Sequence, residues 1–284
     1  MPASGNILSS GELSFLCEQV QVLSMRIGKF IADERKKIKP SDIELKGASD
    51  FVSYVDKTAE KYFVEGLSEI FPPAGFIAEE DATLKTEEPY NWIIDPLDGT
   101  TNYLHGIPCF ATSVALVENG KPVIGVVFEI NTQECFYAWK NGGAWMNGEK
   151  ISVSKTSALQ DSFLATGFPY KAQGWHIPYL ELFADLQKSS VGMRRLGSAA
   201  TDIAYVASGR FDGYYECGIN AWDVAAGAML VLEAGGMVTD FKGGDDFIFG
   251  RKFICGNKKV HAELLSKIQH YLDGINLHET EKQE

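Results

Sequence analysis

The chain begins with two stretches in which apolar residues recur at steps of three and four, the spacing of an amphipathic helix. The first covers about residues 12–38, and Ser9 and Glu12 have the spacing of a capping box at its start. The second covers about residues 53–71 and ends at a pair of prolines. The connection between them, residues 39–50, is polar and rich in turn formers, which predicts a mobile loop.

Short apolar runs predict β-structure in the next third of the chain. The runs at 75–78 and 90–94 both lead directly into carboxylates, so two neighbouring strands would bring acids to one point. Beyond them, three apolar runs predict an antiparallel meander, with an Asn-Gly turn between the first two and two more Asn-Gly turns after the third. These runs are 110–117, 123–130 and 134–139.

From residue 162 onward the pattern changes to an alternation of strands and helices. Strands are predicted at 162–166, 191–196, 213–216, 237–239 and 253–255, and helices at 199–208, 221–234 and 258–272. Helices followed by hairpins and then by mixed elements indicate a layered α+β fold. No Pro-, Gly- or Ser-rich linker divides residues 1–284, so we expect one domain with approximate halves 12–155 and 156–272, and a disordered polar tail at 278–284.

Composition excludes several classes of protein. A net charge of −12 and a pI near 5.0 argue against nonspecific binding of nucleic acid. The five cysteines are scattered and include no C-x-x-C pair, so neither a disulfide framework nor a zinc site is indicated. No signal peptide and no run of 18 or more apolar residues is present, so we expect a soluble, cytoplasmic protein that does not act at a membrane.

Four carboxylates are candidate ligands for a divalent cation. Glu79, Asp95 and Asp98 follow the two strand candidates, and Asp223 opens a helix of small and apolar residues. Mg²⁺ prefers octahedral oxygen coordination, so such a site requires that these acids converge. Three of them also have a structural alternative: a solvated corner for Glu79, a turn for Asp95, and an N-cap for Asp223.

Two long segments decide between these alternatives by resemblance. WIIDPLDGTTNYLHGIP, from Trp92 to Pro108, and WDVAAGAMLVLEAGG, from Trp222 to Gly236, closely resemble the two signature motifs of the inositol monophosphatase family. Shorter matches extend the resemblance over about residues 12–270. It implies an αβαβα sandwich of the inositol monophosphatase and fructose-1,6-bisphosphatase type, commonly a homodimer. It also implies a phosphoric monoester hydrolase that uses Mg²⁺ and is often inhibited by Li⁺.

The resemblance also assigns cation ligands. Glu79, Asp95 and the Leu97 carbonyl would hold the first Mg²⁺, while Asp95, Asp98 and Asp223 would hold the second. Glu79 could assist a third ion through waters. Mn²⁺ is a conceivable substitute, and Li⁺ and Ca²⁺ are conceivable inhibitors. Ala78 departs from the pattern, because the family usually has glycine immediately before the two glutamates, which puts the local backbone geometry in question.

The remaining assignments concern the substrate and the attacking water. The catalytic residues would be Glu79, Thr100 and Asp56, with the Thr100 hydroxyl paired to Asp56 and both orienting, with Glu79, a metal-activated water. The backbone N–H groups of Gly99 and Thr100 would bind the phosphate, helped by the start of a short helix. The substrate contacts would be Gly99, Thr100, Asp98, Asp223, Lys46, Glu216 and the turn Gly197-Ser198-Ala199.

The expected substrate is a small phosphorylated polyol or sugar, with inositol 1-phosphate first. A 3′(2′),5′-bisphosphate nucleotidase is an alternative, although that branch commonly has DGTKEF where this chain has DGTTNY. Fructose-1,6-bisphosphatase, NADP phosphatase and histidinol-phosphate phosphatase activities use the same metal core. The alternative of another class is a noncatalytic regulatory or RNA-machinery partner that keeps the fold.

Overall fold

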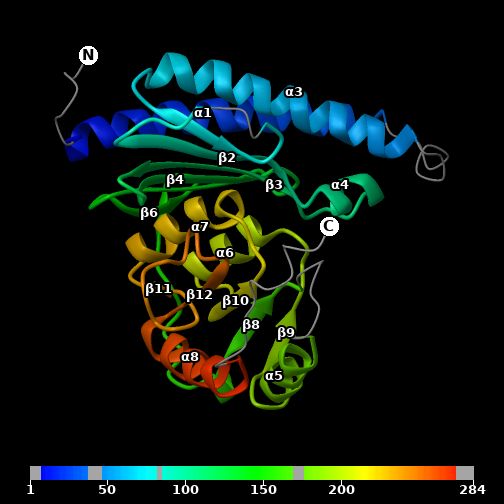
Figure 1. Ribbon diagram of the computed structural model, residues 1–284, viewed down its shortest axis with the longest axis vertical. Coiled ribbons are helices and arrows are strands. Elements are labelled where there is room, and N and C mark those ends of the chain that lie inside the picture. Colours follow the sequence, from blue (N-terminus) through cyan, green and yellow to red (C-terminus); the bar gives the residue numbers. More distant parts are fainter. Residues whose placement is uncertain (1–7, 38–46, 82–84, 169–175, 273–284) are drawn as a thin grey trace.

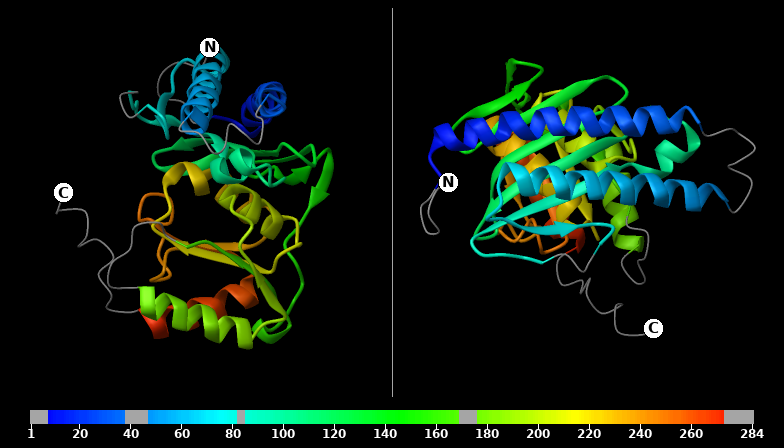
Figure 2. Two further views of the ribbon diagram at one scale, coloured as in Figure 1. Left: turned by 90° about the vertical axis from the view of Figure 1, so that its right-hand side faces the viewer. Right: turned by 90° about the horizontal axis from the view of Figure 1, so that it is seen from above.

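The structure is a computed structural model that describes residues 8–37, 47–81, 85–168 and 176–272. Its elements form five layers in the order helices, sheet, helices, sheet, helices (Figures 1 and 2). The predicted αβαβα sandwich is therefore confirmed. The predictions for Lys46 and for the tail at 278–284 fall outside the described residues.

The outermost layer consists of α1 (Ser10–Arg35) and α3 (Gly47–Ile70), which run side by side across one face of the first sheet (Figure 2). The capping box of α1 is present, since Ser9 N–H donates to Glu12 Oε2 at 2.8 Å and Glu12 N–H donates to Ser9 Oγ at 3.3 Å. Helix α3 begins before the predicted residue 53, so residues 47–50 are helical and the loop prediction was wrong there. The first turn of a helix tolerates polar residues, which is why an apolar period does not reveal it.

The first sheet has seven strands in chain order, and the predicted meander forms most of it. Its strands are β1 (Gly75–Ala78), β2 (Tyr90–Asp98), β3 (Ala111–Glu118), β4 (Lys121–Glu129), β5 (Glu134–Trp139), β6 (Gly143–Met146) and β7 (Glu149–Ile151). The pairing of β1 with β2 is parallel, and all the others are antiparallel. Strand β2 is buried along all nine residues and does not end at Ile94 as predicted, because the chain keeps its pairing with β3 as far as Asp98.

The second sheet is mixed and has the order β11-β12-β10-β8-β9. Its strands are β8 (Phe163–Thr166), β9 (Gly192–Arg194), β10 (Gly213–Cys217), β11 (Met237–Thr239) and β12 (Lys252–Gly256). Helices α6 (Ala199–Ala207) and α7 (Ala221–Glu233) lie between the two sheets, and α5 (His176–Lys188) and α8 (Lys258–Leu272) cover the outer face of the second (Figure 1). The sequence interpretation did not include α5.

The five cysteines are unpaired thiols, as expected, and all but Cys109 are buried. No described helix is both long and apolar enough to cross a membrane.

The first sheet approaches the central helices closely at Gly125 of β4. A Cβ atom there would lie 2.4 Å from the Ala226 carbonyl oxygen and 2.9 Å from Met229 Cβ, both on α7. We therefore expect Gly125→Ala to lower the free energy of unfolding by about 1–3 kcal/mol, the usual cost of overpacking a core. Urea unfolding measures this change.

The matched control for Gly125→Ala is Gly11→Ala in α1, where nothing lies within 4 Å of the added Cβ. Alanine has the higher helix propensity, so this change should leave stability equal or raise it by up to about 1 kcal/mol. Equal unfolding free energies for the two variants would contradict the close approach of β4 to α7.

Candidate active site

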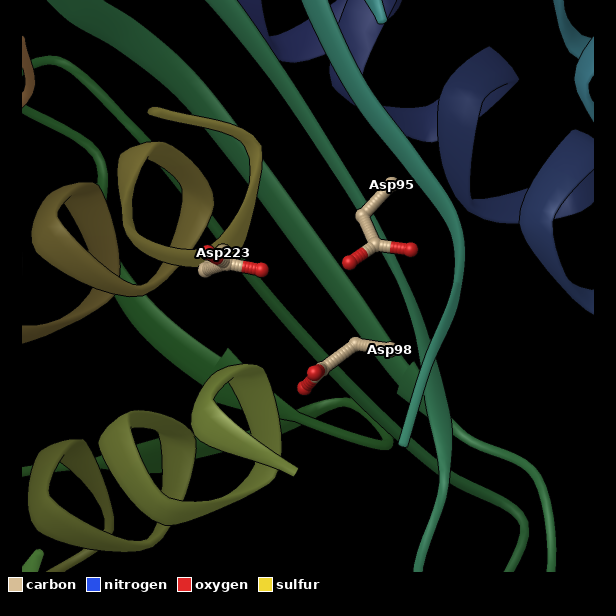
Figure 3. A group of neighbouring side chains, drawn as sticks. All are labelled: Asp95, Asp98 and Asp223. Atoms are coloured by element: carbon tan, nitrogen blue, oxygen red, sulfur yellow. The ribbon is translucent and has the colours of Figure 1, made fainter. Parts of the chain in front are cut away.

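Three carboxylates from distant parts of the chain converge at the edge of the layer between the sheets. Asp95 and Asp98 come from the end of β2, and Asp223 comes from the first turn of α7. Figure 3 shows their side chains directed toward a common point. One ligand atom from each lies within 4.8 Å of those of the other two.

An irregularity in β2 allows Asp95 and Asp98 to face the same side. Residues three apart in a regular strand point to opposite faces. Here the register with β3 shifts between the two aspartates, as in a β-bulge. Asp95 Oδ1 accepts the Leu97 N–H at 2.9 Å, and the Leu97 carbonyl accepts the Thr100 hydroxyl at 3.0 Å. The Asp-Pro-Leu-Asp segment thus turns around the Asp95 carboxylate, which accepts a hydrogen bond from the backbone of the same segment.

Asp98 connects the first sheet to α6. Its Oδ2 accepts the Ser198 hydroxyl at 2.6 Å and the Ala200 N–H at 2.7 Å, so it satisfies a donor at the start of that helix. Asp223 is not the N-cap of α7, contrary to the structural alternative. The N-cap is Asn220, and Asp223, three residues on, accepts the Asn220 N–H at 2.7 Å.

The electrostatics of the cluster favour a bound cation. Burial, and then the neighbouring carboxylates, raise the pKa of Asp95 and Asp223 well above the usual range. Burial raises the pKa of Asp98, although the Ser198 hydroxyl and the Ala200 N–H oppose the shift. Hard oxygen ligands that repel one another when ionised fit a divalent cation such as Mg²⁺.

A cavity of about 330 Å³ opens beside this cluster. Most of the predicted site residues line it. They are Glu79, Asp95, Leu97, Asp98, Gly99, Thr100, Gly197, Ser198, Ala199, Glu216 and Asp223.

Glu79 and Asp56 complete the acidic region. Burial, followed by Asp98 and Glu80, raises the pKa of Glu79 to about 7. Burial and the glutamates beyond β1 raise the pKa of Asp56 to about 8. The predicted pairing of Asp56 with Thr100 is not formed: the Thr100 hydroxyl donates to Leu97, and Asp56 Oδ1 is buried with no hydrogen-bond partner among the described residues.

Gly99 shapes the turn that follows Asp98. Its φ of +91° lies in the left-handed region, and a Cβ would approach the Cys109 carbonyl oxygen to 2.9 Å. Glycine is therefore required both by conformation and by space. The turn directs the chain into α4 (Thr100–His105), whose first N–H groups have no partner within the helix.

Glu216 lies in the cavity wall, on strand β10. The Tyr214 hydroxyl donates to its Oε2, and Gly167 leaves the space that the carboxylate occupies, since a Cβ there would collide with it. Burial raises the pKa of Glu216 to about 7, while Tyr214 and Arg195 oppose the shift.

Sequence reasoning missed two charged residues of the cavity, Arg195 and Asp202. Asp202 is in the first turn of α6, where an acid is ordinary, so its position alone gave no signal. In the structure it is buried, with Oδ1 lacking a hydrogen-bond partner among the described residues, and burial raises its pKa well above the usual range. Arg195 precedes the Gly197-Ser198-Ala199 turn, which was recognised.

Ser198 offers a test of how α6 supports the cluster. Ser198→Ala removes the hydroxyl that donates to Asp98 and that accepts the Thr201 N–H at 3.3 Å as the N-cap of α6. Loss of a cap costs about 1 kcal/mol of stability, and loss of a partner to a metal ligand costs about 10- to 100-fold in affinity. We expect binding of Mn²⁺, a calorimetric probe of a divalent-cation site, to weaken by that factor.

Ser189→Ala is the matched control, because the Ser189 hydroxyl donates to the Asp185 carbonyl at the end of α5, away from the cavity. It should leave the Mn²⁺ affinity unchanged. An unchanged affinity in Ser198→Ala as well would show that α6 does not orient Asp98.

Comparisons with known proteins agree with this geometry. The sequence profile of the inositol monophosphatase family matches residues 13–273. Over 245 residues, the chain is 42% identical to the inositol-1-monophosphatase of Rhizobium meliloti and 38% identical to the Nus factor SuhB of Escherichia coli, and each match covers 86% of this chain and 92% of the relative. The structure of inositol monophosphatase from Anabaena superposes with a TM-score of 0.82 at 35% identity, covering 91% of this chain and 97% of that one. The chain thus belongs to the inositol monophosphatase family, whose members are metal-dependent phosphatases.

Proposed function

We propose that the protein hydrolyses a phosphate monoester of a small neutral polyol, with inositol 1-phosphate as the first candidate, and that it requires Mg²⁺. The observation that carries this proposal is the convergence of Asp95, Asp98 and Asp223 beside the Gly99 turn, in the wall of a cavity that Glu216 also lines. The family match and the 42% identity to an inositol-1-monophosphatase support it.

The proposal assigns two cations to the site. Glu79, Asp95 and the Leu97 carbonyl would hold one, and Asp95, Asp98 and Asp223 the other, with Asp95 shared because a carboxylate has two oxygens. Mg²⁺ so placed supplies Lewis-acid stabilisation of the phosphoryl oxygens and lowers the pKa of a coordinated water.

The protein's own groups position the reactants. The Gly99 and Thr100 N–H groups donate to the phosphate oxygens, as backbone donors beside a left-handed glycine commonly do. Glu79 accepts the proton of the attacking water. Thr100, held by Leu97 at 3.0 Å, orients that water through its hydroxyl oxygen.

The lining of the cavity favours a neutral leaving group. Glu216 and Asp202 both line the wall, and Arg195 supplies the one basic side chain among the described lining residues. Arg195 opposes the upward shift in the pKa of both acids, so its charge is already directed at them. A second phosphate would find no other cationic side chain in the described part of this lining, whereas the hydroxyls of a polyol can hydrogen-bond to both acids. Bisphosphate nucleotides, fructose 1,6-bisphosphate and NADP should therefore be poorer substrates.

A phosphate-release assay tests the proposal. Protein freed of cations with EDTA is supplied with Mg²⁺, Mn²⁺, Ca²⁺ or no metal and offered inositol 1-phosphate, fructose 1,6-bisphosphate, adenosine 3′,5′-bisphosphate and NADP. We expect the highest kcat/KM with inositol 1-phosphate and Mg²⁺, activity with Mn²⁺, and inhibition by Ca²⁺ and Li⁺. A preference for adenosine 3′,5′-bisphosphate would overturn the substrate, and sedimentation would test the homodimer that the family implies.

A noncatalytic role is the alternative, because relatives from several bacteria, including Escherichia coli, are named Nus factor SuhB. The intact set of carboxylates argues for catalysis, and the net charge of −12 argues against direct binding of nucleic acid. Equal phosphate release with and without the protein in all metals would favour the alternative.

A further inference from the structure

We propose that Glu60, on α3, is a positioning residue: it fixes the turn that carries Glu79 and so sets the cation affinity of the site and the rate of the chemical step. The inference rests on the proposed function, in which Glu79 holds a cation and accepts a proton.

Glu79 needs such support because it lies just beyond the end of an edge strand. Strand β1 pairs with β2 alone, and their register ends at Ala78 opposite Ile94. At Glu79 and Glu80 the backbone bends and is no longer part of the strand. The ladder that holds Asp95 and Asp98 in β2 therefore does not hold Glu79.

Glu60 supplies the missing anchor. Its Oε2 accepts the Glu80 N–H at 2.8 Å, a charge-assisted hydrogen bond to the residue next to Glu79. The Glu60 side chain is buried, with 4% of its surface exposed, whereas its neighbours Lys57 and Lys61 are exposed. This hydrogen bond connects α3 to the turn and joins two residues that are 20 positions apart in the sequence.

Helix α3 is a rigid base for this anchor. Along its inner face, side chains on both sides of Glu60 are completely buried. They are Val55, Ala59, Phe63 and Leu67. A carboxylate on a well-packed helix holds its partner more accurately than a carboxylate on a loop would.

Electrostatic stability does not explain why an acid is present here. Three acids lie near Glu60. Asp56 is four residues earlier on α3, and Glu80 and Asp81 are in the turn that Glu60 holds. Burying a carboxylate among other acids is unfavourable unless hydrogen bonds compensate for it. We therefore attribute the presence of Glu60 to its role as the acceptor for the Glu80 N–H of the turn.

The consequence for Glu79 is geometric. Partners that orient a metal ligand typically contribute 10- to 100-fold to affinity or activity, and small displacements of a reacting group have similar effects. Substrate affinity depends on the Gly99 turn and the Glu216 wall, which Glu60 does not touch. Loss of Glu60 should therefore affect kcat and the cation more than KM.

Two nearly isosteric variants isolate the acceptor oxygen. Glu60→Met keeps the length of the side chain and removes the acceptor, whereas Glu60→Gln keeps a carbonyl oxygen that can accept the Glu80 N–H. We expect Glu60→Met to lower kcat and to raise the Mg²⁺ concentration for half-maximal activity by about 10- to 100-fold, with KM within about twofold. Glu60→Gln should stay within about threefold of the wild type, because the hydrogen bond is kept. Glu69→Ala, which removes an exposed acid from the same helix, is the control and should change nothing.

Two measurements do not depend on activity. Mn²⁺ binding by calorimetry should weaken in Glu60→Met and recover in Glu60→Gln, and hydrogen exchange at the Glu80 amide should accelerate in Glu60→Met alone. An inactive wild type would overturn the proposed function, while these readouts would still decide the role of Glu60. Unchanged Mn²⁺ affinity in Glu60→Met, or equal losses in both variants, would overturn the inference. Should Glu60→Met not fold, rapid exchange of the Glu80 amide in the wild type would overturn it as well.

Discussion

Asp95→Asn is expected to reduce kcat/KM for inositol 1-phosphate by about a thousandfold, equivalent to about 4 kcal/mol, while making the cation-free protein more stable. The carboxylate is proposed to hold both cations, whose contribution to the transition state is several kcal/mol. In the absence of cations, however, Asp95 is a buried acid whose pKa burial, Glu79 and Asp98 raise well above the usual range. Asparagine keeps the Oδ1 that accepts the Leu97 N–H and removes the cost of ionisation.

Opposite changes in activity and in stability are the signature to look for. Phosphate release in saturating Mg²⁺ and thermal unfolding in EDTA at about pH 8 measure the two. Asp245→Asn is the control, because that aspartate is exposed and far from β2 in sequence. A variant that loses both activity and cation-free stability would show that Asp95 serves the fold instead of a cation.

The second large effect concerns pH. We expect the cation-free protein to become less stable as pH rises from about 6.5 to about 8.5. Burial raises the pKa of Asp56 from 3.8 to about 8 and that of Glu79 from 4.5 to about 7. The folded protein therefore keeps protons that the unfolded chain has released. Stability from these groups is complete below their unfolded pKa values and is lost as pH passes through the folded ones.

Saturating Mg²⁺ should restore stability mainly at the upper end of this range, because the cation binds the ionised carboxylates. At a hundred times its dissociation constant, a ligand adds about 2.7 kcal/mol to the free energy of unfolding. The pH range from about 6.5 to about 8.5 avoids the titration of His261. Burial lowers the pKa of His261 to about 4, so this residue destabilises the fold only in acid. Thermal unfolding with EDTA or Mg²⁺ at both ends checks the result.

A matched variant assigns the pH effect. Asp56→Asn should flatten the pH dependence of the cation-free protein in part, because one of the raised groups no longer titrates. Asp245→Asn should leave the curve as it is in the wild type. If Mg²⁺ stabilised the protein equally at both ends of the pH range, the loss of stability at high pH would not come from ionisation of these carboxylates.

The periodicity of apolar residues was sufficient to predict most of the fold. It located the two outer helices, the meander and the alternating elements of the second half. It failed at α5, although Tyr179, Leu182 and Leu186 are buried at helical spacing. On the outer face of that helix Ile177 and Leu180 are exposed, and these extra apolar residues hide the period.

The site could be predicted to a different extent for each kind of residue. Residues in the two long motifs were found, and the structure brings them to one cavity. Asp202 was not found, because it is buried only when α6 packs between the two sheets (Figure 1). That packing belongs to the tertiary structure and has no local sequence pattern. The hydrogen-bond partner of the Thr100 hydroxyl could not be predicted either. The bulge in β2 brings the Leu97 carbonyl within reach of this hydroxyl, and no local sequence pattern indicates that partner.

The hydrogen bond from Ser198 to Asp98 spans 100 positions of sequence. During synthesis the first sheet emerges from the ribosome before its partner helices exist, with the face that α6 and α7 later cover still exposed. That face includes Ile93, Ala115 and Val127, which are buried in the finished protein. Assembly of the acidic centre is consequently a late event in folding, since contacts so distant in sequence form slowly. Until then, the nascent chain presents an apolar sheet on which aggregation can begin.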